Sequence, residues 1–115
     1  MTLSVWKIRL GAEAENDFAR ILKDTKETFG PQQAEIYKQT LVDSLLALGG
    51  EGPNILGSTA RYEILPNLRT LHVARRGRRG RHFIMYRAGE ENVIDVIRIL
   101  YDAMDLARHI PPDVA

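Results

Sequence analysis

Apolar residues recur at three- and four-residue intervals in two consecutive segments of the N-terminal half. The first stripe, after Gly11, consists of Ala14, Phe18, Ile21, Leu22, Thr25 and Phe29. The second consists of Ala34, Tyr37, Leu41, Leu45 and Leu48. Each spacing is that of one helix face, and Gly30-Pro31 between them suits a helix end followed by a first helical turn. The pattern predicts an antiparallel helical hairpin that ends at Gly49-Gly50.

The apolar period changes to two on both sides of this hairpin. Residues 3–10 (LSVWKIRL) predict a short N-terminal strand with buried side chains on more than one face. In the C-terminal half, alternation predicts strands over residues 68–73, 81–87 and 92–101. The turns ARRGRRG and AGEEN between them have lengths that suit antiparallel hairpins, so these strands are expected to form a meander.

Two further segments complete the expected fold. Residues 49–60 (GGEGPNILGSTA) have no period and many turn formers, which predicts a loop. Asp102 is expected to cap a final short helix through Arg108, before Pro111-Pro112. The chain is therefore expected to be one α+β domain over residues 1–115, a two-helix hairpin packed on a small, mainly antiparallel sheet, in the order β-α-α-β-β-β-α.

The composition narrows the class of protein. A chain of 115 residues has room for one core, and the absence of cysteine excludes disulfides, zinc-thiolate sites and cysteine nucleophiles. No apolar run approaches the roughly 18 residues of a membrane span, and the first ten residues lack a leader pattern. We therefore expect a cytoplasmic protein that does not bind a membrane.

Positive charge is concentrated in the second half of the chain. Residues 1–60 hold six Lys or Arg and eight acids, a net of −2, whereas residues 61–115 hold ten Arg and seven acids, a net of +3. Residues 64–89 contain seven Arg and no acid. Arginine in preference to lysine favours forked recognition of carboxylate or phosphate. The run Arg75-Arg76-Gly77-Arg78-Arg79 is open to two interpretations, a solvated hairpin tip or a nucleic-acid contact.

Single residues in the C-terminal half have structural interpretations beside functional ones. The ring of Tyr86 is expected to pack against the helices. Arg98 stands in an apolar strand, so it either lies on an exposed sheet face or pairs with a carboxylate, for which Asp105 and Glu63 are candidates. His82 and His109 lack companions at metal-ligand spacing, and His109 could cap a helix end.

Enzyme motifs give little support to metabolic chemistry. The sequence has no phosphate-cradling glycine loop, no Gly-x-Ser-x-Gly elbow and no paired carboxylates at helix-face spacing that would suggest a glycosidase or protease. We expect neither a metal nor a cofactor.

The C-terminal segment resembles the ParE toxins of the RelE/ParE superfamily of type II toxin-antitoxin modules. The resemblance rests on GRHFIMYR (80–87), on the I-x-V-x-R-I-L strand (94–100) and on M-D-x-x-R-H (104–109). Upstream, A-E-x-D (14–17) and F-G-x-x-Q-A (29–34) also match. ParE proteins commonly place His after R-I-L, where this chain has Tyr101.

The resemblance implies a stable toxin that a labile ParD-type antitoxin neutralises and that usually acts on DNA gyrase. It would contact DNA only indirectly, through the antitoxin. The alternative is a RelE-like, ribosome-dependent mRNA endonuclease, which needs a base, an acid and a cation on the phosphate. Arg69, Arg81 and Arg87 could supply the cation, and Tyr101 or His109 the acid-base function.

Two sets of candidate residues follow. The antitoxin is expected to contact Trp6, Phe18, Leu22, Arg69, Arg81 and Arg87. The target is expected to contact Arg98, Tyr101, Met104, Arg108 and His109.

Overall fold

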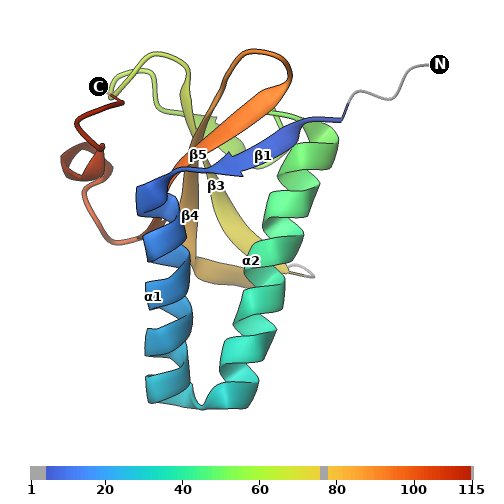
Figure 1. Ribbon diagram of the computed structural model, residues 1–115, viewed down its shortest axis with the longest axis vertical. Coiled ribbons are helices and arrows are strands. Elements are labelled where there is room, and N and C mark those ends of the chain that lie inside the picture. The colour runs from blue at the N-terminus through green and yellow to red at the C-terminus, as the bar shows by residue number, and fades with distance from the viewer. Residues whose placement is uncertain (1–4, 76–77, 115) are drawn as a thin grey trace.

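The computed structural model describes residues 5–75 and 78–114. A helical hairpin stands in front of a sheet, and the C-terminal segment lies beside the first helix (Figure 1). The elements are β1 (Lys7–Leu10), α1 (Ala12–Phe29), α2 (Pro31–Glu51), β2 (Ser58–Ala60), β3 (Leu68–Arg75), β4 (Arg78–Ala88), β5 (Val93–Tyr101) and the 3-10 helix η1 (Leu106–His109). The expected α+β arrangement of a two-helix hairpin on a small sheet is confirmed.

The sheet has the strand order β1-β5-β4-β3-β2. Strands β2 to β5 form antiparallel pairs in sequence order, which confirms the predicted meander. Strand β1 is added at the edge and runs parallel to β5, with Lys7 beside Val93 and Leu10 beside Val96. The N-terminal strand is thus joined to the last strand of the chain.

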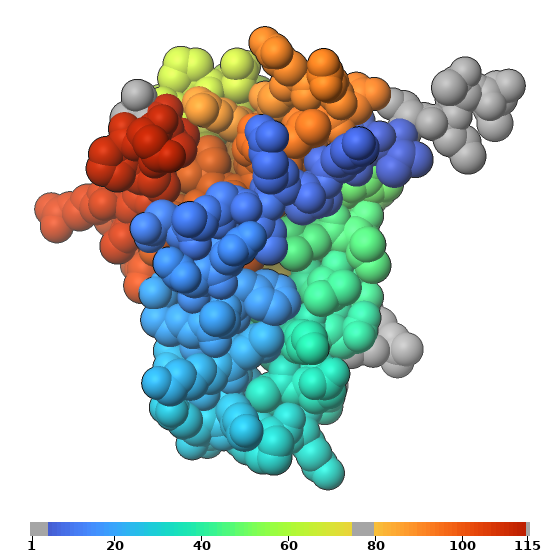
Figure 2. Space-filling view, viewed as in Figure 1, coloured from blue at the N-terminus to red at the C-terminus, as the bar shows by residue number. Residues whose placement is uncertain are grey.

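Apolar residues cover both faces of this sheet. On one face the helices bury a core that includes Ala14, Leu41, Ile84 and Val96. Tyr86 is fully buried in this core, as expected, and its hydroxyl donates to the carbonyl of Pro53 at 2.7 Å. In the space-filling view, the helices form a layer in front of the sheet (Figure 2).

The opposite face carries a second apolar cluster. It consists of Leu68, Met85, Ile97, Leu100 and Leu106, with Ile64, Leu65, Phe83, Ile110 and Val114 packed against it. The segment before β3 and the C-terminal segment therefore serve as the cover that a third layer would otherwise provide. None of the helices in the described ranges is long and apolar enough to cross a membrane.

The predicted ends of the helices are partly wrong. Helix α2 does not end at Gly49-Gly50 but continues to Glu51, and Gly52, with φ of 93°, terminates it. Gly49 lies inside the helix at a point where the backbone of Trp6 passes close to it, and the Trp6 N–H donates to the Gly49 carbonyl at 2.9 Å. Phe29, which was assigned to the buried stripe, is 71% exposed at the tip of the hairpin.

The expected loop over residues 49–60 is shorter than predicted. Its last three residues form β2, which pairs with β3 through Ser58 and Leu71. Asp102 is not the cap of the final helix: the Asp105 carboxylate accepts the N–H of Ala107 at 3.2 Å at the start of η1. Strands β3 and β4 are longer than predicted, and the centre of the arginine-rich turn, residues 76–77, lies outside the described residues, as do residues 1–4.

Candidate functional site

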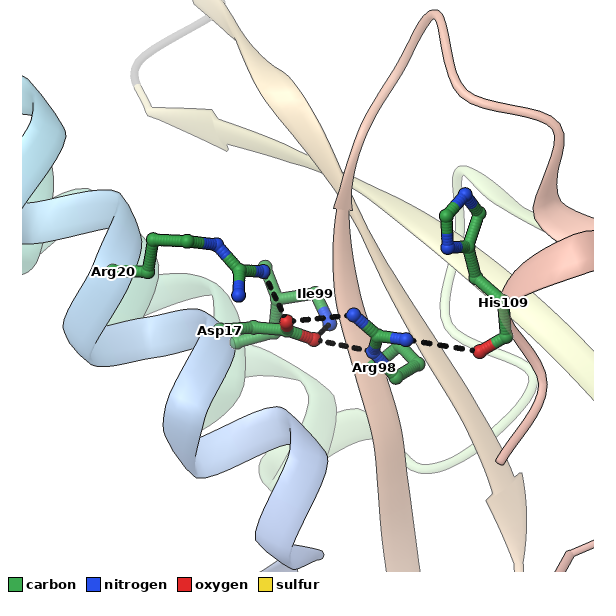
Figure 3. Close-up of polar contacts among 5 residues, drawn as sticks. All are labelled: Asp17, Arg20, Arg98, Ile99 and His109. Atoms are coloured by element: carbon green, nitrogen blue, oxygen red, sulfur yellow. Dashed lines mark hydrogen bonds and ion pairs between the residues drawn. The ribbon is translucent and has the colours of Figure 1, made fainter. Parts of the chain in front are cut away.

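A buried carboxylate joins helix α1 to strand β5 (Figure 3). Asp17 is fully buried and accepts two hydrogen bonds from Arg98, at 2.7 Å from Nε and 2.9 Å from Nη2. It also accepts the backbone N–H of Ile99 at 2.9 Å, and Arg20 forms a further ion pair with it. Arg98 in turn donates to the carbonyl of His109 at 3.2 Å, so the same network holds the C-terminal segment.

This network corrects the predicted partner of Arg98. The carboxylate is that of Asp17, not Asp105 or Glu63, and Asp105 pairs instead with Arg108. Burial opposes ionisation of Asp17, but the hydrogen bonds from Arg98 and Ile99 and the charge of Arg98 outweigh it, so the pKa of Asp17 is lowered. Asp17 is therefore an ionised residue inside the protein.

A second polar cluster lies at the other end of the helical hairpin. The Tyr37 hydroxyl and His82 Nδ1 are 2.6 Å apart, and the Arg81 backbone N–H donates to the same hydroxyl at 3.2 Å. The ring of His82 meets the ring of Tyr101 edge-on, with centroids 5.9 Å apart, and Arg81 Nη1 donates to the Tyr101 hydroxyl at 3.2 Å. Helix α2 and the ends of β4 and β5 thus bring these four side chains together.

The direction of the hydrogen bond between Tyr37 and His82 depends on the tautomer of His82. The Tyr37 oxygen accepts the Arg81 N–H, and it can either donate its own proton to Nδ1 or accept a second proton from Nδ1. If Tyr37 donates, the neutral ring carries its proton on Nε2. Burial lowers the pKa of His82, with the neighbouring His72 acting in the same direction, while Asp102 and Asp17 oppose the shift.

This cluster lines a groove of about 390 Å³ between the hairpin tip and the sheet, which we call the distal groove. Its lining residues are Asp24, Thr25, Thr28, Phe29, Gln33, Ile36, Tyr37, Arg81, His82 and Tyr101. Phe29 and Ile36 are exposed at its rim. A mostly apolar groove with a few converging polar groups is suited to receive part of a partner molecule.

The residues predicted to contact the antitoxin differ in their exposure and in the groups that they already contact. Trp6, Phe18 and Leu22 are half-buried and pack against the core. Arg69 donates to Ser58 Oγ at 2.8 Å and to the Tyr62 hydroxyl at 3.2 Å, and Arg87 lines a hollow beside the start of α1. Arg81 is the exposed member of the set that faces the distal groove.

The predicted target contacts divide into two groups. Tyr101, Met104 and Arg108 are exposed at the end of β5 and in the segment after it. Arg98, by contrast, is occupied by Asp17, and His109 is half-buried with its carbonyl bound to Arg98. A target contact by Arg98 or His109 stays a prediction that would require this network to open.

Some of these features were missed at the level of sequence. Tyr37 was assigned to the core stripe, and its hydroxyl chemistry gave no local signal because its partner His82 is 45 residues away. Asp17 stands out in the sequence only as part of the A-E-x-D motif, and its partner Arg98 is 81 residues away. Within residues 5–75 and 78–114, no group of three His, Asp or Glu side chains is placed to hold a metal ion.

Comparisons with known proteins bear on the identity of this fold. Residues 8–106 match the family described as "ParE toxin of type II toxin-antitoxin system, parDE". A solved structure described as "Chromosomal ParDE TA system from P. aeruginosa" has a similar fold, with a TM-score of 0.68 at 19% identity over 85% of this chain and 97% of that chain. A search of curated proteins finds no significant match. Since the matched family covers most of its length, the chain belongs to the ParE toxin family of type II toxin-antitoxin systems.

Proposed function

We propose that this toxin is neutralised by a ParD-type antitoxin and inhibits DNA gyrase by binding to it, without hydrolytic chemistry. The pair would act in the cytoplasm, and the toxin would contact DNA only through the antitoxin. The absence of hydrolytic chemistry is proposed because Arg69 and Arg87 lie far along the sheet from Arg81 and Tyr101.

Arg81 and Arg87 lie six residues apart on β4, a separation of about 20 Å along a strand. Arg69 is paired with Tyr86, next to Arg87, whereas Tyr101 is paired with His82, next to Arg81. RNA cleavage needs the base, the acid and the phosphate-binding cation within a few ångströms of one phosphate. The sheet face opposite the helices, where such groups could otherwise gather, is filled by the second apolar cluster.

One observation favours the RelE-like alternative. Arg81 and the Tyr101 hydroxyl are in hydrogen-bond contact, so a cation and a phenol stand together at the end of the last strand. Both side chains are exposed, so a phosphate can approach them. Among the described residues the His82 ring lies beside Tyr101, and its Nδ1 is engaged by Tyr37.

The experiment places the two activities side by side. Purified toxin is added to a gyrase supercoiling assay and to translating ribosomes with a defined mRNA. We expect inhibition of supercoiling and intact mRNA. Ribosome-dependent cleavage that disappears in Tyr101→Phe, with supercoiling unaffected by the wild type, would establish the endonuclease instead.

The proposed binding of an antitoxin is supported by exposed apolar and charged side chains on the toxin. Exposed apolar side chains at the hairpin tip lie near an arginine that has no carboxylate partner among the described residues. A partly disordered acidic tail that folds on this surface would cover both, and tight binding should bury more than about 1,600 Å². Co-purification and a structure of the complex test this, and an antitoxin that touches only residues 49–60 would contradict it.

A further inference from the structure

Exposed apolar side chains gather around the distal groove. Among the described residues, eight large apolar side chains are exposed, and four of them border the groove or the adjoining hollow beside His82. These four are Phe29, Ile36, Tyr101 and Met104. They come from α1, α2, the end of β5 and the segment after it, so the chain brings them together only by folding.

Arg81 lies at the rim of the groove and can still bind a carboxylate. Arg81 is exposed, and within the described part of the chain its guanidinium bonds to the Tyr101 hydroxyl and to no carboxylate. The hydrogen bond to Tyr101 holds the guanidinium in place and raises the pKa of Arg81. An exposed arginine held in one position is suited to a carboxylate that arrives with a partner.

The floor of the groove contains His82, and burial lowers its pKa and so favours the neutral ring. In the arrangement in which Tyr37 donates, Nδ1 accepts that proton, and in the described residues nothing bonds to Nε2. If the ring gained a proton, Nδ1 would become a donor, and the Tyr37 hydroxyl would have to turn its own proton away. Protonation would therefore place both a charge and an unpaired hydroxyl proton beside the groove.

We propose that the distal groove receives an apolar side chain of the antitoxin next to an acidic residue that binds Arg81, and that this occupancy requires neutral His82. The proposal rests on the proposed function and adds a pH dependence to it. An apolar side chain seated over His82 removes water from the ring and so disfavours the imidazolium. By linkage, protonation of His82 must weaken antitoxin binding to the same extent.

Charged and titratable groups from each neighbouring element determine how strong this coupling is. Asp17 and Asp24 face the site from α1, Tyr37 from α2, His72 from β3 and Arg81 from β4. Tyr101 and Asp102 face it from the end of β5. The carboxylates favour the charged form of His82, whereas burial and His72 favour the neutral form. A bound apolar side chain would favour the neutral form further.

The first test locates the partner. Ile36→Asp places a charge at the rim of the groove, and Leu46→Asp is the matched control because Leu46 is exposed on the same helix outside the groove. With the full-length ParD-type antitoxin at pH 8, we expect Ile36→Asp to weaken binding at least tenfold and Leu46→Asp less than twofold. Equal effects would show that the antitoxin lies elsewhere and would overturn the proposal.

The second test asks whether the pH dependence of antitoxin binding comes from His82. In His82→Asn the amide oxygen can still accept from Tyr37, but the side chain does not titrate. Between pH 8 and pH 5 we expect the dissociation constant of the wild type to rise roughly tenfold more than that of His82→Asn, which corresponds to a shift of about one pKa unit on binding. The same rise in both proteins would assign the pH dependence to other groups and contradict the role of His82.

A measurement on the free toxin separates this inference from the proposed function. The ¹⁵N shifts of the His82 ring should show the Nε2–H tautomer at pH 8 and a pKa that rises in Tyr37→Phe. A protonated Nδ1 at pH 8 would overturn the inference even if the antitoxin binds. Absence of antitoxin binding at pH 8, with the expected ring shifts present, would instead overturn the proposed function.

Discussion

The Asp17 carboxylate takes the place of a neighbouring strand along part of one edge of β5. Strand β1 pairs with β5 only from Val93 to Val96, so on that side of β5 it does not reach Ile99, whose other side pairs with β4. The Asp17 carboxylate accepts the N–H of Ile99 and neutralises Arg98, whose side chain is 14% exposed. A buried cation and a buried amide both depend on the Asp17 carboxylate. Asp17 should therefore contribute more to stability than a polar residue on a helix usually does.

Removing Asp17 should destabilise the fold strongly. In Asp17→Ala the Arg98 guanidinium stays buried without its partner, and breaking such a pair costs about 3–5 kcal/mol. Asp24→Ala, an exposed acid on the same helix, should change stability by less than about 0.5 kcal/mol. Urea unfolding of both variants provides the measurement, and a small loss in Asp17→Ala would show that water enters to solvate Arg98.

The same residue should give stability a dependence on acid pH. Since the folded-state pKa of Asp17 is lowered, the unfolded chain takes up the proton first as pH falls. The stabilisation is complete above the unfolded value of about 4 and is lost as pH falls through the folded pKa. The difference in unfolding free energy between wild type and Asp17→Asn should therefore shrink between pH 6 and pH 2.5. A constant difference would contradict the assignment.

At the scale of elements, the junction of β1 with the end of α2 depends on one glycine. A Cβ added at Gly49 would lie 3.0 Å from the Trp6 carbonyl oxygen and 3.3 Å from a side-chain carbon of Ile8. A Cβ at Gly50 would meet nothing within 4 Å. Two adjacent glycines of one helix thus have opposite structural roles, and only the first is needed for close packing.

This contrast predicts opposite effects of two alanine substitutions. Gly49→Ala should push β1 away and destabilise by about 1–3 kcal/mol, as overpacking does. Gly50→Ala should stabilise by up to about 1 kcal/mol, because alanine loses less entropy than glycine in a helix. Thermal melts measure both, and the fluorescence of Trp6, the one tryptophan of the chain, should change only in Gly49→Ala. Equal melting temperatures for the two variants would contradict this account.

Helix side chains also protect the free parts of the sheet edges. Ser44 on α2 lies 3.4 Å from both the N–H and the carbonyl oxygen of Ala74, beyond the three residues that β2 covers. Asp17 has the same role for β5 on the other side. Each helix of the hairpin therefore binds a backbone group of β3 or β5 that the short strands β2 and β1 leave unpaired, which limits pairing with foreign strands there.

At the scale of the whole molecule, charge is divided between the two halves of the chain. The arginine-rich segment 75–79 lies between Arg69 on one side and Arg81 and Arg87 on the other, whereas residues 1–60 have a net charge of −2. Exposed ion pairs add only about 0–1 kcal/mol each, but aligned charges raise association rates roughly tenfold or more at low salt. This arrangement should therefore affect how fast an acidic antitoxin is captured more than it affects stability.

Replacing Arg75, Arg76, Arg78 and Arg79 together by serine tests this expectation. The melting temperature should change little, while association with an acidic antitoxin should slow about tenfold at low salt and less at high salt. Arg81→Ala should instead speed dissociation, because a carboxylate on the antitoxin would lose its forked partner. Stopped-flow association at two salt concentrations distinguishes these effects. Unchanged association at low salt would show that the turn arginines are only solvated surface.

The local pattern by itself determined most of the architecture. Helix stripes, the change of period and the turn residues of the meander are short-range features, so the hairpin, the three long strands and their meander followed from them. The same holds for Tyr86, whose alternation with Ile84 placed it in the core. The ParE-like motifs, which span much of the chain, indicated the family for the same reason.

Tertiary structure decided the features that depend on distant partners. Strand β2 is three residues long and forms beside β3, and α2 continues past Gly49-Gly50, where the N–H of Trp6 from the segment before β1 donates to the Gly49 carbonyl. The pairing of Arg98 with Asp17 joins residues 81 positions apart, and the Tyr37–His82 contact joins residues 45 apart. A hydrogen bond across such a separation has no local signature, since its geometry exists only after the hairpin has docked on the sheet.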